Sequence, residues 1–223
     1  MTGSFSILKS SFEHILFDLD GTLTKSAPGI INSVRHALEK YGIKNQSDEQ
    51  LARFIGPPLT VSFHDFYGFN QAQAEEAMAF YREYYADKGI FENDLYEGIP
   101  EVLDALKSAG KKLYVATSKP EVYMKKILEH YEIAQFFDDA AGGDLEEKNN
   151  EKWCVIKNIL TRNSISGGKS PALMLGDRKH DILGAHKNNL PVCAVMWGYG
   201  SRDEFLEYGA DYVCENVTDL IER

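Results

Sequence analysis

Acidic and hydroxyl side chains follow three separate apolar segments of this chain. Each segment is short, as expected of a buried strand. The polar residues after them are Asp18 and Asp20, Thr117 and Ser118, and Asp177 with Asp181 four positions later. If the strands are parallel, their carboxyl ends meet at one edge of the sheet, where ligands bind. The sequence therefore predicts that these six side chains converge on one site.

The carboxylates of Asp18 and Asp177 would repel each other side by side, unless a cation lay between them. Oxygen ligands that are few, and that leave room for waters and a phosphate, suit Mg²⁺ better than zinc. Thr117 and Ser118 can donate hydroxyl or backbone N–H hydrogen bonds to phosphate oxygens. These residue types together favour a magnesium site that receives a phosphate group.

A lysine completes the expected set. Lys152 begins a helical pattern with Val155 and Ile156 inward, and it could supply a positive charge to the same phosphate; Lys148 is the alternative. Each motif also has a simpler interpretation, because turns are rich in aspartate and most lysines are solvated. The 117–120 segment could be only a strand-to-helix turn. The combination of motifs, rather than any single one, supports a functional site.

The second half of the chain alternates helix and strand. The expected strands are residues 14–18, 112–116, 138–141, 172–175, 192–196 and 212–214. Helices are expected at 100–110, 120–130, 150–162, 181–188 and 204–208. Strands separated by helices indicate right-handed crossovers and a parallel sheet that is covered on both faces.

Residues 24–92 differ, because helical periodicity dominates and strand signals are few. An apolar stripe over 30–41 predicts a first helix, and a capping-box sequence at Ser47 predicts a second helix that ends by Gly56. A third helix, capped by Asn70, is expected to run to Lys88. We therefore expect a small all-helical domain here.

The simplest fold that fits is α/β. A Rossmann-like parallel sheet with helices on both faces would form the core, from residues 1–23 and 93–223. The all-helical domain, residues 24–92, would be inserted after the first strand.

Composition excludes several classes of function. The chain has 223 residues and a formal net charge of −10, which argues against general binding to nucleic acid or to anionic membranes. Its three cysteines have no CxxC spacing and are expected to be core residues rather than a zinc or disulfide site. No signal-peptide core and no membrane-spanning apolar run is evident, so we expect a cytoplasmic protein.

The motifs together resemble those of the haloacid-dehalogenase-like hydrolase superfamily. In order, they are Asp18-Leu-Asp20-Gly21-Thr22-Leu23-Thr24, Thr117-Ser118, Lys152 and Gly176-Asp177-Arg-Lys-His-Asp181. The block at 24–92 is where many members carry a helical cap. Within the superfamily, residues 55–59 and 197–201 resemble the phosphoglycolate-phosphatase-like branch, and some similar bacterial proteins are labelled 5′-nucleotidases.

The resemblance implies a role for each motif residue. Asp18 would attack phosphorus and form an aspartyl-phosphate, while Asp20 would protonate the leaving group and then activate water. Because Asp20 must be protonated for the first step, its surroundings should differ from those of Asp18. The remaining implied roles are Mg²⁺ binding by Asp18, Asp177 and the Asp20 carbonyl; phosphate or substrate binding by Gly21, Gly56, Thr117, Ser118 and Lys152; and support by Asp181, which would orient Lys152 or a metal-bound water.

The expected function is that of a Mg²⁺-dependent hydrolase of phosphoric monoesters, acting on a small phosphorylated metabolite. Phosphoglycolate is the first candidate substrate, followed by nucleoside 5′-monophosphates and pyrophosphate. A phosphosugar mutase and a non-catalytic binding module are the alternatives, and the retained aspartates and lysine count against the module. Dehalogenation is disfavoured because Asp20 and the Mg²⁺ ligands belong to the phosphatase form of the site. No long exposed apolar stripe is evident, which favours a monomer.

Overall fold

The computed structural model describes residues 6–145, 150–165 and 171–222. Its described parts form two compact units: a core unit, within residues 1–24 and 95–223, and a helical unit, residues 25–94. The core unit contains a six-stranded parallel sheet with the order β3-β2-β1-β4-β5-β6. The strands are β1 (His14–Phe17), β2 (Lys112–Pro120), β3 (Asp139–Gly143), β4 (Ala172–Gly176), β5 (Val192–Val195) and β6 (Tyr212–Cys214). The predicted α/β class with a parallel sheet is confirmed.

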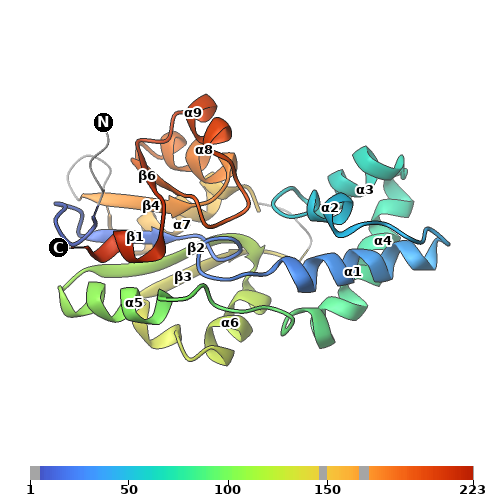
Figure 1. Ribbon diagram of the computed structural model, residues 1–223, viewed down its shortest axis with the longest axis horizontal. Helices are drawn as coiled ribbons and strands as arrows, with labels where there is room; N and C mark the ends of the chain where they lie inside the picture. Colours follow the sequence, from blue (N-terminus) through green and yellow to red (C-terminus); the bar gives the residue numbers. More distant parts are fainter. Residues whose placement is uncertain (1–5, 146–149, 166–170, 223) are drawn as a thin grey trace. The chain divides into compact units, whose positions relative to one another are not determined.

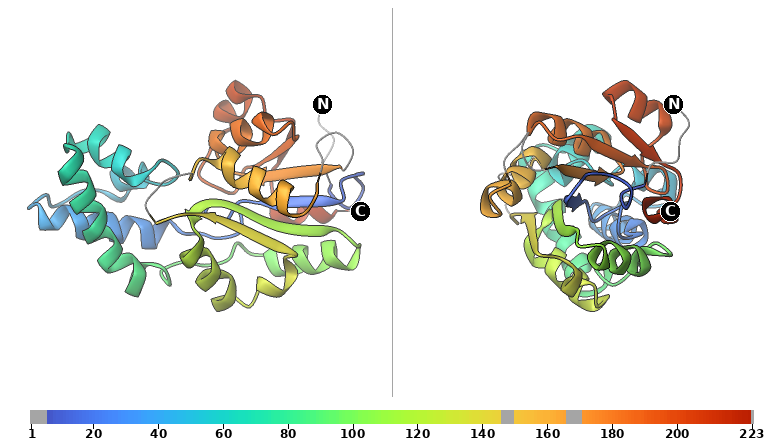
Figure 2. Two further views of the ribbon diagram at one scale, coloured as in Figure 1. Left: turned by 180° about the vertical axis from the view of Figure 1, so that it is seen from behind. Right: turned by 90° about the vertical axis from the view of Figure 1, so that its left-hand side faces the viewer.

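Helices cover both faces of this sheet (Figures 1 and 2). α5 (Ile99–Ser108) and α6 (Glu121–His130) pack on one face. α7 (Lys152–Arg162) and α8 (Lys179–Lys187) pack on the other, where α8 also contacts α9 (Arg202–Tyr208). Short 3₁₀ turns, η2 (Ala134–Phe136) and η3 (Val217–Ile221), complete the described elements of the core unit. No described helix is both long enough and apolar enough to cross a membrane.

The central strands are apolar on both faces, as expected for a sheet between two helical layers. All five residues of β4 are buried, and so are three of the four residues of β1. Leu16 and Met174 face the α7 and α8 layer, where they pack with Val155 and Ile182. Burial of these side chains favours the observed register, because sliding either strand along the sheet would draw the aspartate that follows it, Asp18 or Asp177, in among apolar neighbours. That register decides which residues meet at the edge of the sheet.

The helical unit has an aromatic core. Its elements are α1 (Ala27–Lys40), α2 (Asp48–Ala52), α3 (Leu59–Tyr67), α4 (Gln71–Tyr84) and the π-helical turn η1 (Tyr85–Gly89). Phe63 lies at its centre, with ring centroids 4.9 Å from Phe54 and 5.8 Å from Phe69. The capping boxes at Ser47 and Asn70 form as their sequences indicate. This unit therefore has its own hydrophobic core.

The helix α3 was not expected, and two element boundaries differ from those expected. α3 begins directly after Pro58, because proline is disfavoured inside a helix but compatible with the residue before it. α4 gives way to the turn η1 at Tyr85, before the expected end at Lys88. β2 continues to Pro120, four residues beyond its expected end. The last difference matters most, since it places polar residues on a strand.

The Asn70 capping box gives a test of the helical unit. The Asn70 carboxamide accepts a hydrogen bond from the Gln73 N–H, and the Gln73 side chain accepts one from the Asn70 N–H, both at 3.0 Å. Asn70→Ala should lower the free energy of unfolding by about 1 kcal/mol in urea denaturation. Gln71→Ala, at an exposed position of the same turn, should change it by less than about 0.5 kcal/mol. If both variants lost the same free energy of unfolding, the Asn70 cap would contribute no more to stability than an ordinary exposed side chain.

Candidate active site

The candidate site lies where three neighbouring strands end. β1 is between β2 and β4, and Phe17 at its end pairs with Val115 on one side and Leu175 on the other. The next residue, Asp18, donates its backbone N–H to the Leu175 carbonyl over 2.9 Å. Strand register thus carries Asp18 into the middle of the edge, between the ends of its two neighbours.

A buried lysine connects two of the predicted aspartates. Lys152 Nζ lies 2.6 Å from Asp18 Oδ1 and 2.9 Å from Asp181 Oδ1. It also donates to the Ala116 carbonyl of β2 over 3.2 Å. Only 5% of the Lys152 side chain is exposed, so these oxygens replace the water that the ammonium group would otherwise bind. The lysine of the predicted set is therefore inside the cluster; Lys148, the alternative, lies outside the described residues.

Asp18, Asp177 and Asp181 form a buried acidic triad, in which one carboxylate oxygen of each lies within 4.8 Å of the others. Asp177 Oδ2 accepts a hydrogen bond of 2.7 Å from the Tyr199 N–H. Its Oδ1 is buried and has no hydrogen-bond partner among the described residues. A buried oxygen without a partner, beside further carboxylates, is suited to a hard divalent cation. The residues present therefore fit the predicted Mg²⁺.

Burial shifts the proton affinities of these groups. The pKa of Asp18 is raised to about 6: burial has the largest effect, the Lys152 charge opposes it, and the Asp181 charge adds to it. The pKa of Asp177 is raised well above its ordinary value by burial, then by Asp181 and Asp18. Burial would lower the pKa of Lys152, but the two carboxylates beside it raise that pKa above its ordinary range. One lysine is thus insufficient to balance three carboxylates, which is the condition that a bound cation relieves.

Glycines allow the backbone to close around Asp177. A β-carbon at Gly21 would lie 2.1 Å from Asp177 Oδ2, and Gly21 has φ = 83°, a conformation that favours glycine. A β-carbon at Gly198 would lie 2.3 Å from the Asp177 β-carbon, and one at Gly200 2.0 Å from its carbonyl oxygen. The predicted role of Gly21 in binding phosphate or substrate stays a prediction; what the structure shows is that its backbone lies close to Asp177. That close approach explains the glycine on steric grounds.

Asp181 has a structural position as well as a charge. It lies in the first turn of α8, where Oδ2 accepts the backbone N–H of Arg178 over 3.0 Å while Oδ1 faces Lys152. A β-carbon at Gly176 would lie 2.1 Å from its carboxyl carbon. Asp181 thus contacts Lys152, and its role in orienting that lysine or a metal-bound water stays a prediction.

Asp20 has a partner that sequence analysis missed. Its Oδ2 lies 2.6 Å from Lys119 Nζ, so the two aspartates of the first motif contact different lysines. Lys119 follows the Thr117–Ser118 pair on the extension of β2, a segment that could also be interpreted as a turn. The sequence does contain a signal for this contact: Lys119 directly follows two hydroxyl residues, Thr117 and Ser118, at the end of an expected strand.

The remaining predicted residues divide between the units. Thr117 is buried and its Oγ1 accepts the Lys119 N–H over 3.2 Å, while Ser118 is half-buried beside it on β2. Gly56 belongs to the helical unit, and its role in substrate binding stays a prediction. The other eight predicted residues belong to the core unit.

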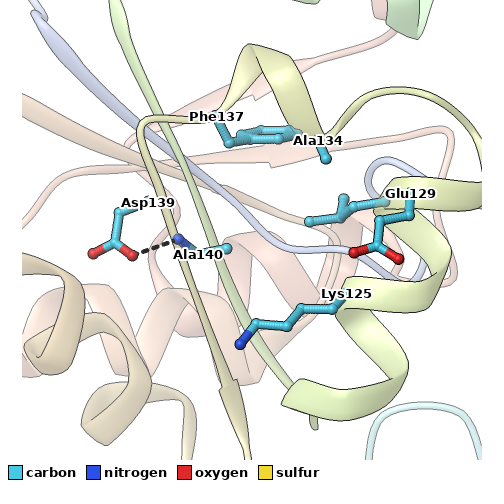
Figure 3. Close-up of a pocket in the computed structure, with 7 residues that line it drawn as sticks. Lys125, Glu129, Ala134, Phe137, Asp139 and Ala140 are labelled. Atoms are coloured by element: carbon cyan, nitrogen blue, oxygen red, sulfur yellow. Dashed lines mark hydrogen bonds between the residues drawn. The ribbon is translucent and has the colours of Figure 1, made fainter.

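A small cavity of about 150 Å³ lies elsewhere on the core unit (Figure 3). Its lining residues come from α6, η2 and the start of β3, and none belongs to the predicted set. They are Lys125, Leu128, Glu129, Ala134, Phe137, Asp139 and Ala140. The acidic triad is therefore the feature of the core unit that matches the predicted chemistry.

Comparison with known proteins identifies the family. Residues 15–195 match the model of the haloacid dehalogenase-like hydrolase family, a range that contains every predicted site residue from Asp18 to Asp181. The chain belongs to this family. A crystal structure of a predicted phosphatase from Clostridium acetobutylicum superimposes with a TM-score of 0.89 at 43% identity, covering 94% of this chain and 96% of that one.

Curated relatives of this haloacid dehalogenase-like hydrolase carry several names. A 5′-nucleotidase from Pseudomonas aeruginosa is 40% identical over 94% of both chains. The tyrosine-protein kinase PtkA of Mycobacterium tuberculosis is 37% identical over 85% of this chain and 64% of its own length. A pyrophosphatase PpaX from Bacillus velezensis and a phosphoglycolate phosphatase from Vibrio parahaemolyticus are 31% and 27% identical, each over 93% of this chain and 94% of their own. The expected family resemblance is confirmed.

The raised pKa of Asp18 predicts the pH dependence of stability in a chelator. Between its ordinary value of 3.8 and about 6, the folded state binds more protons than the unfolded state. The free energy of unfolding should therefore fall as pH rises from 4 to 6, by about 1.4 kcal/mol for each unit of pKa shift. Urea denaturation of wild type and Asp18→Asn, at several pH values with EDTA, isolates this contribution as the difference between the two slopes. Parallel curves would contradict the prediction, and Asp104→Asn, at an exposed position, is the control.

Proposed function

We propose that this hydrolase is a Mg²⁺-dependent phosphatase that cleaves a small phosphomonoester through an aspartyl-phosphate. The observation that carries the proposal is the placement of Asp18, held by Lys152 at 2.6 Å and grouped with Asp177 in the buried triad. A carboxylate nucleophile needs a nearby positive charge to approach an anionic phosphate. The family and its phosphatase-named relatives support the general class, hydrolysis of phosphoric monoesters.

The proposed reaction has two steps. Asp18 attacks phosphorus and the bond to the leaving oxygen breaks, while Asp20 transfers a proton to that oxygen. Asp20 then removes a proton from the water that attacks the aspartyl-phosphate, which releases inorganic phosphate and regenerates Asp18. Lys152 and the hydroxyls of Thr117 and Ser118 stabilise the oxygens of the phosphoryl group as it moves.

Asp18, Asp177 and the backbone carbonyl of Asp20 would hold the Mg²⁺. When bound, the ion reduces the repulsion between the carboxylates and an incoming phosphate. Asp181 supports this arrangement by fixing Lys152, whose ammonium group it contacts over 2.9 Å.

Phosphoglycolate stays our first candidate substrate, with nucleoside 5′-monophosphates and pyrophosphate as the alternatives. Relatives named for each of these activities support the set without ranking it, and the relative named a 5′-nucleotidase has the higher identity. We propose that the helical unit, with the loop at Gly56, acts as a substrate-selecting cap. A phosphosugar mutase and a non-catalytic module rank below a phosphatase, because relatives with phosphatase names support hydrolysis. We retain a cytoplasmic monomer as the expectation.

A panel of phosphate esters tests this function. Phosphoglycolate, nucleoside 5′-monophosphates, sugar phosphates and pyrophosphate should be assayed for phosphate release with Mg²⁺ and with EDTA. We expect one preferred, Mg²⁺-dependent substrate, and a loss of more than about 1,000-fold in Asp18→Asn because the nucleophile is gone. Asp104→Asn, exposed on α5, should keep wild-type turnover. Wild-type turnover by Asp18→Asn would show that Asp18 is not the nucleophile, and no release from any ester would favour the mutase or the module.

Metal binding can be measured without turnover. Because Mg²⁺ binding to the folded state would relieve repulsion in the triad, excess Mg²⁺ should raise the free energy of unfolding, by about 2.7 kcal/mol at a concentration 100 times its dissociation constant. Asp177→Asn should lose most of this increase, whereas Asp104→Asn should keep it. NaCl at equal ionic strength is the control for screening. An equal Mg²⁺ effect in wild type and Asp177→Asn would exclude Asp177 as a ligand.

A further inference from the structure

The ion pair between Lys119 and Asp20 has no role in the reaction described above. Lys119 Nζ lies 2.6 Å from Asp20 Oδ2, and the side chains are 6% and 20% exposed. Ion pairs at the surface contribute little because water and salt screen them, but this pair is mostly removed from water. Holding a lysine in such a place needs a fixed backbone and a defined partner.

The backbone of Lys119 is fixed on the extension of β2. Its N–H donates to Thr117 Oγ1 over 3.2 Å, which ties it to the predicted phosphate-binding pair. On the other side, a β-carbon at Gly142 of β3 would lie 2.7 Å from the Lys119 carbonyl oxygen, so the neighbouring strand packs directly against it. Side chains on rigid strands are positioned more precisely than those on loops. Lys119 can therefore act as a fixed anchor.

The two carboxylate oxygens of Asp20 differ in their surroundings. Oδ2 is held by Lys119, whereas Oδ1 is buried and has no hydrogen-bond partner in the described part of the chain. One oxygen is thus anchored, and the other makes no hydrogen bond that a reacting group would have to displace. A general acid or base must lie within hydrogen-bond reach of the atom it serves, and an error of about 1 Å can cost about 100-fold in rate.

We propose that Lys119 is a positioning residue that fixes the carboxylate of Asp20 through Oδ2 and leaves Oδ1 to exchange the proton with the leaving group. The proposal rests on the proposed function, because it acts through the acid role of Asp20. It assigns Lys119 a role distinct from that of Lys152, which contacts Asp18 and Asp181 instead.

Two substrates separate this role from direct binding of the phosphate. An alkyl phosphate, phosphoglycolate or AMP according to the panel above, needs a proton on its leaving oxygen; p-nitrophenyl phosphate releases a stable phenolate without one. The parameter kcat/KM covers the steps up to release of the leaving group. Lys119→Met should lower kcat/KM about 10- to 100-fold for the alkyl ester, and by less than about 3-fold for the aryl ester.

A double-mutant cycle tests whether Lys119 acts through Asp20. The double variant Asp20→Asn/Lys119→Met should be no slower on the alkyl ester than Asp20→Asn alone, because an absent acid cannot be misplaced. Lys119→Arg should recover most of the activity that Lys119→Met loses. Lys125→Met, which removes an ion pair with Glu121 at the surface, should leave kcat/KM unchanged for both esters.

The possible outcomes separate the proposed role of Lys119 from the proposed function of the protein. Additive losses in the double variant, or equal losses on both esters, would show that Lys119 acts on the phosphate directly and would overturn the proposal. Unchanged kcat/KM in Lys119→Met, alongside a large loss in Asp20→Asn, would also overturn it while the proposed function stands. No hydrolysis by wild type, by contrast, would reject the proposed function itself. If Lys119→Met does not fold, as judged by its thermal unfolding transition, Lys119→Gln replaces it with the same criteria.

Discussion

The ammonium group of Lys152 is the interaction on which the candidate site depends. Three carboxylates lie buried at the end of a sheet, and this lysine contacts two of them at 2.6 and 2.9 Å. Removing one partner from a buried ion pair typically costs about 3–5 kcal/mol, because the remaining charge has neither water nor a counterion. Lys152 reaches these groups because it is the first residue of α7 and lies beside Asp18, Asp181 and the Ala116 carbonyl of β2.

The fold produces this convergence by topology rather than by local sequence. Asp18, Lys152 and Asp177 are far apart in the chain, and each directly follows or begins a regular element. Because β1 lies between β2 and β4, the residues that follow these three strands are neighbours. α7 packs against β2, β3 and α8, so that its first residue, Lys152, reaches the cluster. A charge pattern that would be unfavourable in a flexible chain is thus maintained by a rigid apolar sheet.

Sequence analysis located the parts of the site that depend on strand ends. The apolar segments before Asp18 and Asp177 predict buried strands, and their common orientation brings the two residues together. Lys119 was missed because polar residues after Thr117 are typical of a turn, whereas pairing with β3 extends the strand to Pro120. The contribution of Tyr199 comes from its backbone N–H, so its side-chain type carries no signal for that contact. No helix was expected between Gly56 and Asn70, although Pro58 directly precedes α3 there. For Lys119 and Tyr199, the contacts join residues far apart in the chain, which local patterns do not show.

The close packing of glycines around Asp177 has a consequence for how this protein tolerates mutation. Gly21, Gly198 and Gly200 carry no functional group, yet a single methyl at any of them would overlap an atom of Asp177. In a saturation library selected for activity, these positions would be as invariant as the aspartates themselves. Genetic intolerance alone would therefore overestimate the number of residues that take part in chemistry. In this chain, a position that is invariant because a side chain would not fit looks the same, in sequence variation, as one that is invariant because it reacts. Only the three-dimensional structure distinguishes the two.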